Sequence, residues 1–178
     1  MRAVIDTNIL LVANGQHEAA SPDCVIECVQ RLQYMERSGI IVVDDGYRII
    51  GEYRNKTSPN QPKGAGDVFL KWLLRQASTT RIESVALNER VQYCFAEFPD
   101  PVLEPLFDEK DRVFAAVANA HLSKPPIWQA VDCKWLNWWG ALQAKGVEVV
   151  FLCPADVRTF YCKKFPGRDL PSLPEPSQ

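Results

Sequence analysis

Ile40-Ile41-Val42-Val43 is a short continuous run of β-branched apolar residues. Such a run is typical of a strand buried on both faces of a parallel sheet. Ahead of it, Ser21-Pro22-Asp23 has the order of a helix start, with a serine N-cap, a proline in the first position and an acid in the first turn. Gly39 predicts the end of that helix. Apolar residues 2–5 predict an earlier strand that ends at Asp6, so the order strand, helix, strand predicts a βαβ unit.

The rest of the chain continues this alternation. Helical periodicity is present in four segments, which are the stretch from Asp45 past Tyr53, residues 65–77, Asp111–Leu122 and Lys134–Lys145. Strands are predicted for Ile127–Val131 and Val147–Leu152, whereas Ile82–Leu87 fits either a short strand or a turn. A second apolar stretch at residues 9–12 is read with the first strand.

This pattern predicts one α/β domain over residues 1–165, a three-layer α/β/α sandwich with a mostly parallel central sheet. The polar stretch Thr57–Gly64 is expected to be a loop. A proline-rich tail over residues 166–178 cannot build a core alone and is expected to be extended or disordered.

Composition favours an ordinary globular protein. The chain has 178 residues, of which 47% are hydrophobic and 24% charged. No apolar run approaches the roughly 20 residues that span a bilayer. Asp6 and Asn8 interrupt the apolar N-terminus, unlike a signal peptide. We therefore expect a cytoplasmic protein with no membrane partner.

Six cysteines are present without a C-x-x-C pair, which disfavours a zinc site built on short spacing. In the cytoplasm all six are expected to be reduced thiols. Cys24 and Cys28 lie four residues apart, which places them on one face of the predicted helix. They are interpreted as small, half-buried apolar residues, with metal binding as the alternative.

The net charge of −2 and the pI near 5.7 do not indicate a broad basic surface for nucleic acid. A nuclease remains compatible, because acids gathered in one site lower the total while the rim stays basic. Ordinary solvated surface charge is the alternative for each basic rim candidate. These candidates are Arg48, Arg54, Lys56, Lys63, Lys71, Arg75, Lys163, Lys164 and Arg168.

Four acids fall at comparable places in the predicted fold. Asp6 and Asp132 each follow a strand, Asp111 opens an alanine-rich helix, and Glu52 lies on the helix after the second strand. In a parallel sheet, ligands gather beyond the carboxyl ends of the strands. A cluster of oxygen ligands suits Mg²⁺ or Mn²⁺, which activates water and offsets charge on a phosphate.

Each acid also has a purely structural alternative. Asp6 could cap a helix or a turn, and Asp111 could be a first-turn acid favoured by the helix dipole. Asp132 could be a loop residue and Glu52 a solvated helix acid. The hypothesis of a site depends on all four acids standing at matching ends of their elements.

Four motifs resemble those of the PIN-domain nuclease family, in matching order over roughly residues 1–152. Val4-Ile5-Asp6-Thr7-Asn8-Ile9-Leu10 resembles the N-terminal signature, and Glu52-Tyr53-Arg54 resembles the second motif. Asp111–Ala118 resembles the third motif, an acid that opens an alanine-rich helix. Val131-Asp132-Cys133-Lys134-Trp135 resembles the fourth, although the family usually has Thr, Ser or Asn directly before the acid.

The resemblance implies a flavodoxin-like sandwich with four acids that bind one or two Mg²⁺ or Mn²⁺ ions, acting as an endoribonuclease. The family's metal-binding and catalytic positions fall on Asp6, Glu52, Asp111 and Asp132. Thr7 and Asn8 would orient Asp6 or contact water on the metal, and Asp108 is a reserve candidate. Substrate-binding candidates on the second-motif helix are Arg48, Arg54 and Lys56.

Several functions follow as hypotheses. The first is a metal-dependent endoribonuclease, including the toxin of a toxin–antitoxin pair with an antitoxin partner. The alternatives are an inactive RNA-binding or assembly module, a DNA-directed nuclease and, more remotely, a hydrolase of small phosphate esters. A Rossmann site and Ser/His/Asp catalysis are disfavoured, because the chain has no G-x-G-x-x-G or G-x-S-x-G motif. Trp135, Trp138 and Trp139 predict a core or a homo-oligomer interface, with base stacking as the alternative.

Overall fold

The computed structural model describes residues 1–76 and 79–174. Its centre is a five-stranded, all-parallel sheet in the order β3-β2-β1-β6-β7. The strands are β1 (Arg2–Ile5), β2 (Ile40–Asp44), β3 (Ile82–Val85), β6 (Ile127–Gln129) and β7 (Val149–Phe151). The predicted parallel sheet is confirmed, and the ambiguous stretch after residue 81 is its edge strand.

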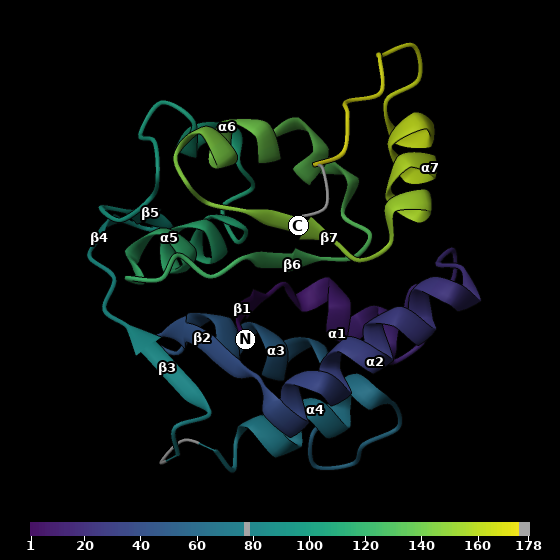
Figure 1. Ribbon diagram of the computed structural model, residues 1–178, viewed down its shortest axis with the longest axis vertical. Coiled ribbons are helices and arrows are strands. Elements are labelled where there is room, and N and C mark those ends of the chain that lie inside the picture. The colour runs from purple at the N-terminus through teal and green to yellow at the C-terminus, as the bar shows by residue number, and fades with distance from the viewer. Residues whose placement is uncertain (77–78, 175–178) are drawn as a thin grey trace.

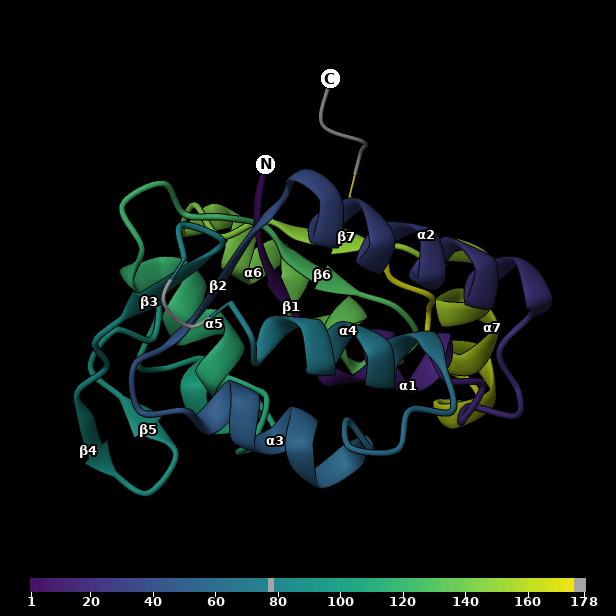
Figure 2. The ribbon, with the colours of Figure 1, turned by 90° about the horizontal axis from the view of Figure 1, so that it is seen from below.

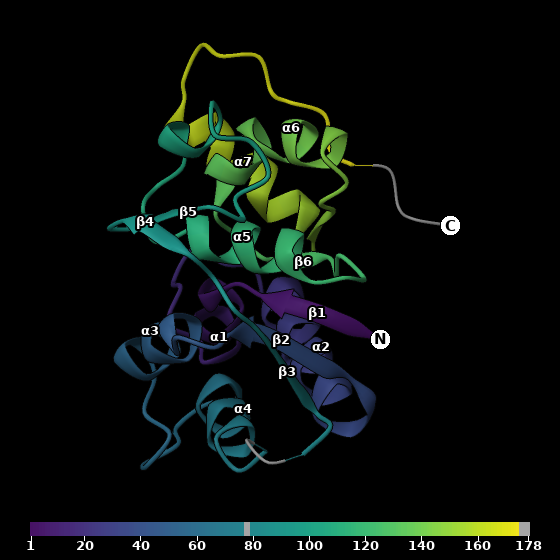
Figure 3. The ribbon, with the colours of Figure 1, turned by 90° about the vertical axis from the view of Figure 1, so that its left-hand side faces the viewer.

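Helices cover both faces of this sheet, as Figures 1, 2 and 3 show from three directions. On one side lie α1 (Thr7–Ala13), α2 (Pro22–Ser38), α3 (Arg48–Lys56) and α4 (Ala65–Leu73). On the other side lie α5 (Arg112–Ala120) and α6 (Trp139–Ala144). The predicted three-layer α/β/α sandwich is therefore confirmed. No helix within the described residues is long and apolar enough to cross a membrane.

The helix starts follow from local chemistry. Ser21 accepts a hydrogen bond from the Cys24 backbone N–H at 3.2 Å and so caps α2, as the sequence predicts. At α3 the acceptor is buried Asp44, whose carboxylate takes the backbone N–H groups of Arg48 and Ile49 at 2.8 and 2.9 Å. The last residue of β2 therefore fixes the start of α3 at the end of the sheet.

Two segments differ from the prediction. Residues 9–12 belong to helix α1 rather than to a strand, because a short apolar run fits a buried helix equally well. The helix predicted for Lys134–Lys145 is split into a 3₁₀ helix η2 (Cys133–Asn137) and α6. The break lets Trp135 and Trp138 both pack on Phe107, with ring centroids 5.7 and 4.1 Å apart. These tryptophans belong to the core, as one of the two hypotheses held.

Three further features were not predicted or only partly so. Helix α7 (Pro154–Lys164) and the antiparallel hairpin of β4 (Glu89–Val91) and β5 (Cys94–Phe95) were missed. The described part of the tail has no regular structure, but it is docked, since Trp139 Nε1 donates to the Ser172 carbonyl at 2.9 Å. The predicted end of the tail, residues 175–178, and residue 77 of the helix predicted for residues 65–77 lie outside the described residues.

Helix α4 approaches α1 closely at Gly66. A Cβ atom there would lie 2.2 Å from the Leu10 carbonyl oxygen, closer than any real contact. We predict that Gly66→Ala lowers the free energy of unfolding by about 1–3 kcal/mol, the usual cost of overpacking. The denaturant midpoint measures this change.

Gly140→Ala is the matched control for that substitution. Gly140 is also helical, but none of the described residues outside its own helix lies within 4 Å of its added Cβ. It is expected to be neutral or to raise the free energy of unfolding by up to about 1 kcal/mol, because alanine reduces the entropy of the unfolded chain. Equal midpoints for the two variants would contradict the close approach of α4 to α1.

Candidate active site

The candidate site lies where the strand order reverses direction. From β1 the chain moves to β2 on one side, whereas β6 pairs with β1 on the other. In open parallel sheets this switch point is the place where ligands bind. Asp6 directly follows β1, and Asp132 comes three residues after the end of β6.

Asp6 is held by several hydrogen bonds although only 5% of it is exposed. Its Oδ1 accepts from the Asn8 backbone N–H at 2.8 Å and from Asn8 Nδ2 at 2.6 Å. Its Oδ2 accepts from Gln129 Nε2 at 3.1 Å. Asp6 is thus the N-cap of α1, the structural role considered from the sequence, and its carboxylate has a defined orientation as well.

Asn8 joins the ends of the two central strands. Its Oδ1 accepts from the Ala130 backbone N–H at 2.9 Å, and its Nδ2 donates to Gln129 Oε1 as well as to Asp6. Gln129 is fully buried at the last residue of β6 and was missed by the sequence reasoning. The available signal was a lone amide inside an apolar strand, which has to find buried partners.

Tyr53 helps to place Glu52. The Tyr53 hydroxyl is buried and donates to the Ile5 carbonyl, which ties α3 to the end of β1 next to Asp6. Glu52, the neighbouring residue, lies in a cleft together with Asp111. The sequence motif around Glu52 therefore contains one side chain for the core and one for the site.

Asp111 and Asp132 are connected by Lys134, which the sequence reasoning did not single out. Lys134 Nζ lies 3.5 Å from Asp132 Oδ2 and 3.8 Å from Asp111 Oδ2, and it pairs with exposed Asp108. Asp132 Oδ1 also accepts from the Lys134 backbone N–H at 3.1 Å. Among the described residues, Asp111 Oδ2 is buried and has no hydrogen-bond partner.

Burial and mutual repulsion shift the pKa values of these acids upward. Burial, with repulsion from Asp132 and Glu52, raises the pKa of Asp6 from 3.8 to about 7. Burial, with repulsion from Asp6, Asp132 and Glu52, raises the pKa of Asp111 from 3.8 to about 9. Burial also raises the pKa of Glu52, opposed by the Thr7 hydroxyl, and the pKa of Asp132, opposed by the Lys134 N–H. The charges of Glu52 and Asp132 therefore act on both Asp6 and Asp111, and the charge of Asp6 acts on Asp111.

Comparisons of the chain with protein-family models, curated proteins and solved structures find no match. The family resemblance of the four motifs stays a prediction. What the site can do therefore rests on its own geometry and chemistry.

The donor set fits a hard divalent cation. Four carboxylates with raised pKa values, and a buried Asp111 oxygen without a hydrogen bond, form an environment that a cation would stabilise. Among the described residues no three of these acids bring one oxygen each within 4.8 Å of one another. An ion held by fewer than three of these acids would complete its coordination shell with water, as Mg²⁺ usually does.

Two clefts of ≈ 540 and ≈ 550 Å³ adjoin the acids. The first is lined by Glu52, Lys56 and Asp111, and the second by Asp132 and Lys134. Lys163 and Lys164, at the end of α7, also line the second cleft. Cationic side chains thus stand beside the acids, as expected for a site that attracts phosphate.

The remaining predicted site residues have different surroundings. Thr7 is buried, whereas Arg54 and Lys56 are exposed on α3. Arg48 pairs with Glu89 and lies 3.7 Å from Asp44 Oδ2, so its guanidinium has partners within the fold. Asp108 is largely exposed, pairs with Lys134 and lines the first cleft together with Asp111.

Proposed function

We propose that this chain is a Mg²⁺- or Mn²⁺-dependent nuclease that cleaves phosphodiester bonds in RNA. The observation that supports it is the convergence of Asp6, Glu52, Asp111 and Asp132 at the switch point of the sheet, where their charges act on one another. Carboxylate clusters of this kind are the ligands that phosphodiester-cleaving metal ions use.

The residues divide the work according to their contacts. Asn8 and Gln129 hold the Asp6 carboxylate in one orientation, and Asp111 presents an oxygen with no protein hydrogen bond. Lys163 and Lys164 attract substrate phosphates toward the acids. When bound, the divalent ion supplies a water of lowered pKa and offsets charge on the phosphate.

Substrate and partners are part of this proposal. The preference for RNA over DNA follows from the family resemblance, as do an antitoxin partner and assembly into a homo-oligomer. A cytoplasmic location is proposed on the same basis. The disulfide described below is more typical of oxidising compartments, so cell fractionation is the direct test of location.

One observation favours a second candidate, a PIN-like module that binds RNA without cutting it. The Lys134 ammonium lies within 4 Å of two of the four acids and is an internal counter-charge for them. Because this ammonium already offsets part of the negative charge, a bound metal ion would stabilise the site less. Mn²⁺ titration separates the two candidates, because the inactive module would bind no ion at millimolar Mn²⁺.

The test of the proposed nuclease is a cleavage assay on the full chain. Single-stranded RNA, structured RNA and DNA are each incubated with Mn²⁺, with Mg²⁺ or with EDTA. We expect RNA to be cut only with a divalent ion. RNA binding without cleavage under every condition would favour the inactive module, and cleavage of DNA alone would favour the DNA-directed nuclease.

Lys134→Met is predicted to tighten Mn²⁺ binding by about tenfold or more. A positive charge about 4 Å from a carboxylate opposes a second cation there by several kcal/mol when the effective dielectric constant is about 20. Electron paramagnetic resonance of free Mn²⁺ measures the affinity without any turnover. Lys163→Met is the control, because Lys163 is exposed and forms no ion pair with these acids among the described residues; its change should be under about threefold. Unchanged or weaker Mn²⁺ binding by Lys134→Met would show that Lys134 does not compete with a cation.

A further inference from the structure

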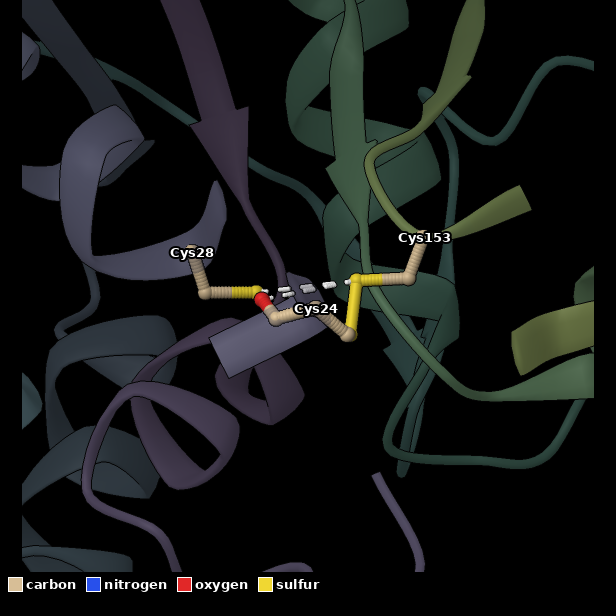
Figure 4. A group of neighbouring side chains, drawn as sticks. All are labelled: Cys24, Cys28 and Cys153. Atoms are coloured by element: carbon tan, nitrogen blue, oxygen red, sulfur yellow. Dashed lines mark hydrogen bonds between the residues drawn. A yellow bond between two sulfur atoms is a disulfide. The ribbon is translucent and has the colours of Figure 1, made fainter. Parts of the chain in front are cut away.

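Three buried cysteines meet at one point. Cys24 and Cys28 lie one turn apart on α2, and Cys153 is the N-cap residue directly before α7 (Figure 4). A disulfide joins Cys24 to Cys153, and Cys28 Sγ lies 4.0 Å from Cys153 Sγ. The expectation of six reduced thiols was therefore wrong for this pair, which is separated by 129 residues.

A structural disulfide needs only two of these residues. The third, Cys28, is fully buried, and the sulfurs of all three lie within 4.8 Å of one another. Among the described residues this is the only place where three potential metal ligands come so close. Sequence reasoning placed Cys24 and Cys28 on one helix face, and the fold adds the third sulfur from a distant part of the chain.

We propose that Cys24, Cys28 and Cys153 in their reduced form make a binding site for one Zn²⁺ ion, which the Cys24–Cys153 disulfide closes. Thiolates are the preferred ligands of such borderline-soft cations, at about 2.3 Å from sulfur to metal. Three protein ligands leave one coordination position for water or another ligand. The proposal is independent of the proposed nuclease function.

Charge favours a divalent over a monovalent ion. Three thiolates carry three negative charges, so Zn²⁺ leaves a net charge of −1, whereas Cu⁺ would leave −2 in a buried place. Burial, with the negative charges of Glu27 and Asp156, raises the pKa of the Cys28 thiol to about 12. A bound cation reverses this effect, because a coordinating thiol loses its proton to the metal.

A dithiol reductant opens the site. The Cys24–Cys153 disulfide takes up two electrons and two protons and becomes two thiols, while a dithiol reductant is oxidised to its own disulfide. Zn²⁺ then displaces three protons from three thiols, and no electrons move. A disulfide oxidant reverses the step: it takes two electrons from the Cys24 and Cys153 thiolates, takes up two protons and becomes a dithiol, while the Cys24–Cys153 disulfide re-forms. Two of the three ligands are then lost, Cys28 regains a proton, and the ion is released.

The test uses the full chain, reduced with a dithiol under anaerobic conditions and then freed of reductant. One portion is loaded with Zn²⁺ to measure metal content, and another with Co²⁺, whose thiolate complexes give a near-ultraviolet charge-transfer band. That band requires sulfur ligands, so it separates this site from the carboxylate site. We expect the reduced chain to show the cobalt band and to bind one Zn²⁺ more than the oxidised chain, which should show no band.

Cys28→Ala is the informative variant, because it leaves the Cys24–Cys153 disulfide in place and its fold can be verified in the oxidised form. It is expected to weaken Zn²⁺ binding to the reduced chain at least about 100-fold, more than the loss of an outer-shell partner. Buried Cys133→Ala and exposed Cys162→Ala are the controls and should keep the band. A cobalt thiolate band of unchanged intensity in Cys28→Ala, or no band in the reduced wild type, would overturn the proposal.

Discussion

Asp6→Asn is expected to reduce divalent-metal-dependent RNA cleavage at least about 100-fold, since even outer-shell partners of a metal ligand cost 10–100-fold. The amide oxygen of asparagine can still accept the Asn8 backbone hydrogen bond that caps α1. The fold should therefore survive while the negative charge is lost. Cleavage rates at saturating Mn²⁺ measure the effect, and thermal unfolding verifies the fold.

Asp45→Asn is the matched control for this variant. Asp45 is also an acid at the end of a central strand, directly after β2, but its side chain is exposed. Its cleavage rate should stay within about threefold of the wild type, as for an ordinary surface substitution. Metal-dependent cleavage by Asp6→Asn at the wild-type rate would refute the proposed site.

The second large effect is a loss of stability as the pH rises in the absence of divalent cations. In the folded protein the pKa of Asp6 is raised from 3.8 to about 7 and that of Asp111 from 3.8 to about 9. At a pH between 3.8 and the raised pKa of each group, the folded state holds more protons than the unfolded state. The free energy of unfolding therefore falls as the pH increases through this range. The stabilisation is complete below about pH 4 and is lost as the pH rises through about 7 for Asp6 and about 9 for Asp111.

Asp111→Asn should remove much of this pH dependence. The amide is neutral at every pH, so the variant is expected to be more stable than the wild type at pH 9 and to differ little near pH 4. Denaturant unfolding in EDTA across this range measures the free energies. Asp45→Asn should retain the wild-type slope, and the same slope in Asp111→Asn would show that Asp111 keeps its charge in the folded protein.

Adding Mn²⁺ to the same titration links stability to the site. A cation that binds only the folded, deprotonated site should raise the melting temperature more at pH 8 than at pH 5, because protons compete with the metal at Asp6 and Asp111. On this hypothesis, repulsion among the carboxylates lowers the stability of the metal-free protein and increases the stabilisation that a bound cation gives.

Local sequence was enough for the features whose causes lie within one turn or one strand. Ser21 and Pro22 begin α2 through capping, Gly39 ends it, and the run Ile40–Val43 makes a strand buried on both faces. The alternation of such elements also predicts the layered parallel fold. With that fold in mind, the strand-end positions of Asp6 and Asp132 point to the same edge of the sheet.

Pairings between distant residues were decided only by the tertiary structure. Three such pairings join parts of the chain that neither hydrophobic periodicity nor a capping motif relates. They are the hydrogen bond from Gln129 to Asp6, the ion pair of Lys134 with Asp111, and the disulfide between Cys24 and Cys153. They depend on the order of the strands and on which side chains face one another across it. The sequence by itself therefore determined most of the elements and the acids at their ends, whereas tertiary packing determined the neighbours that set the pKa values of those acids.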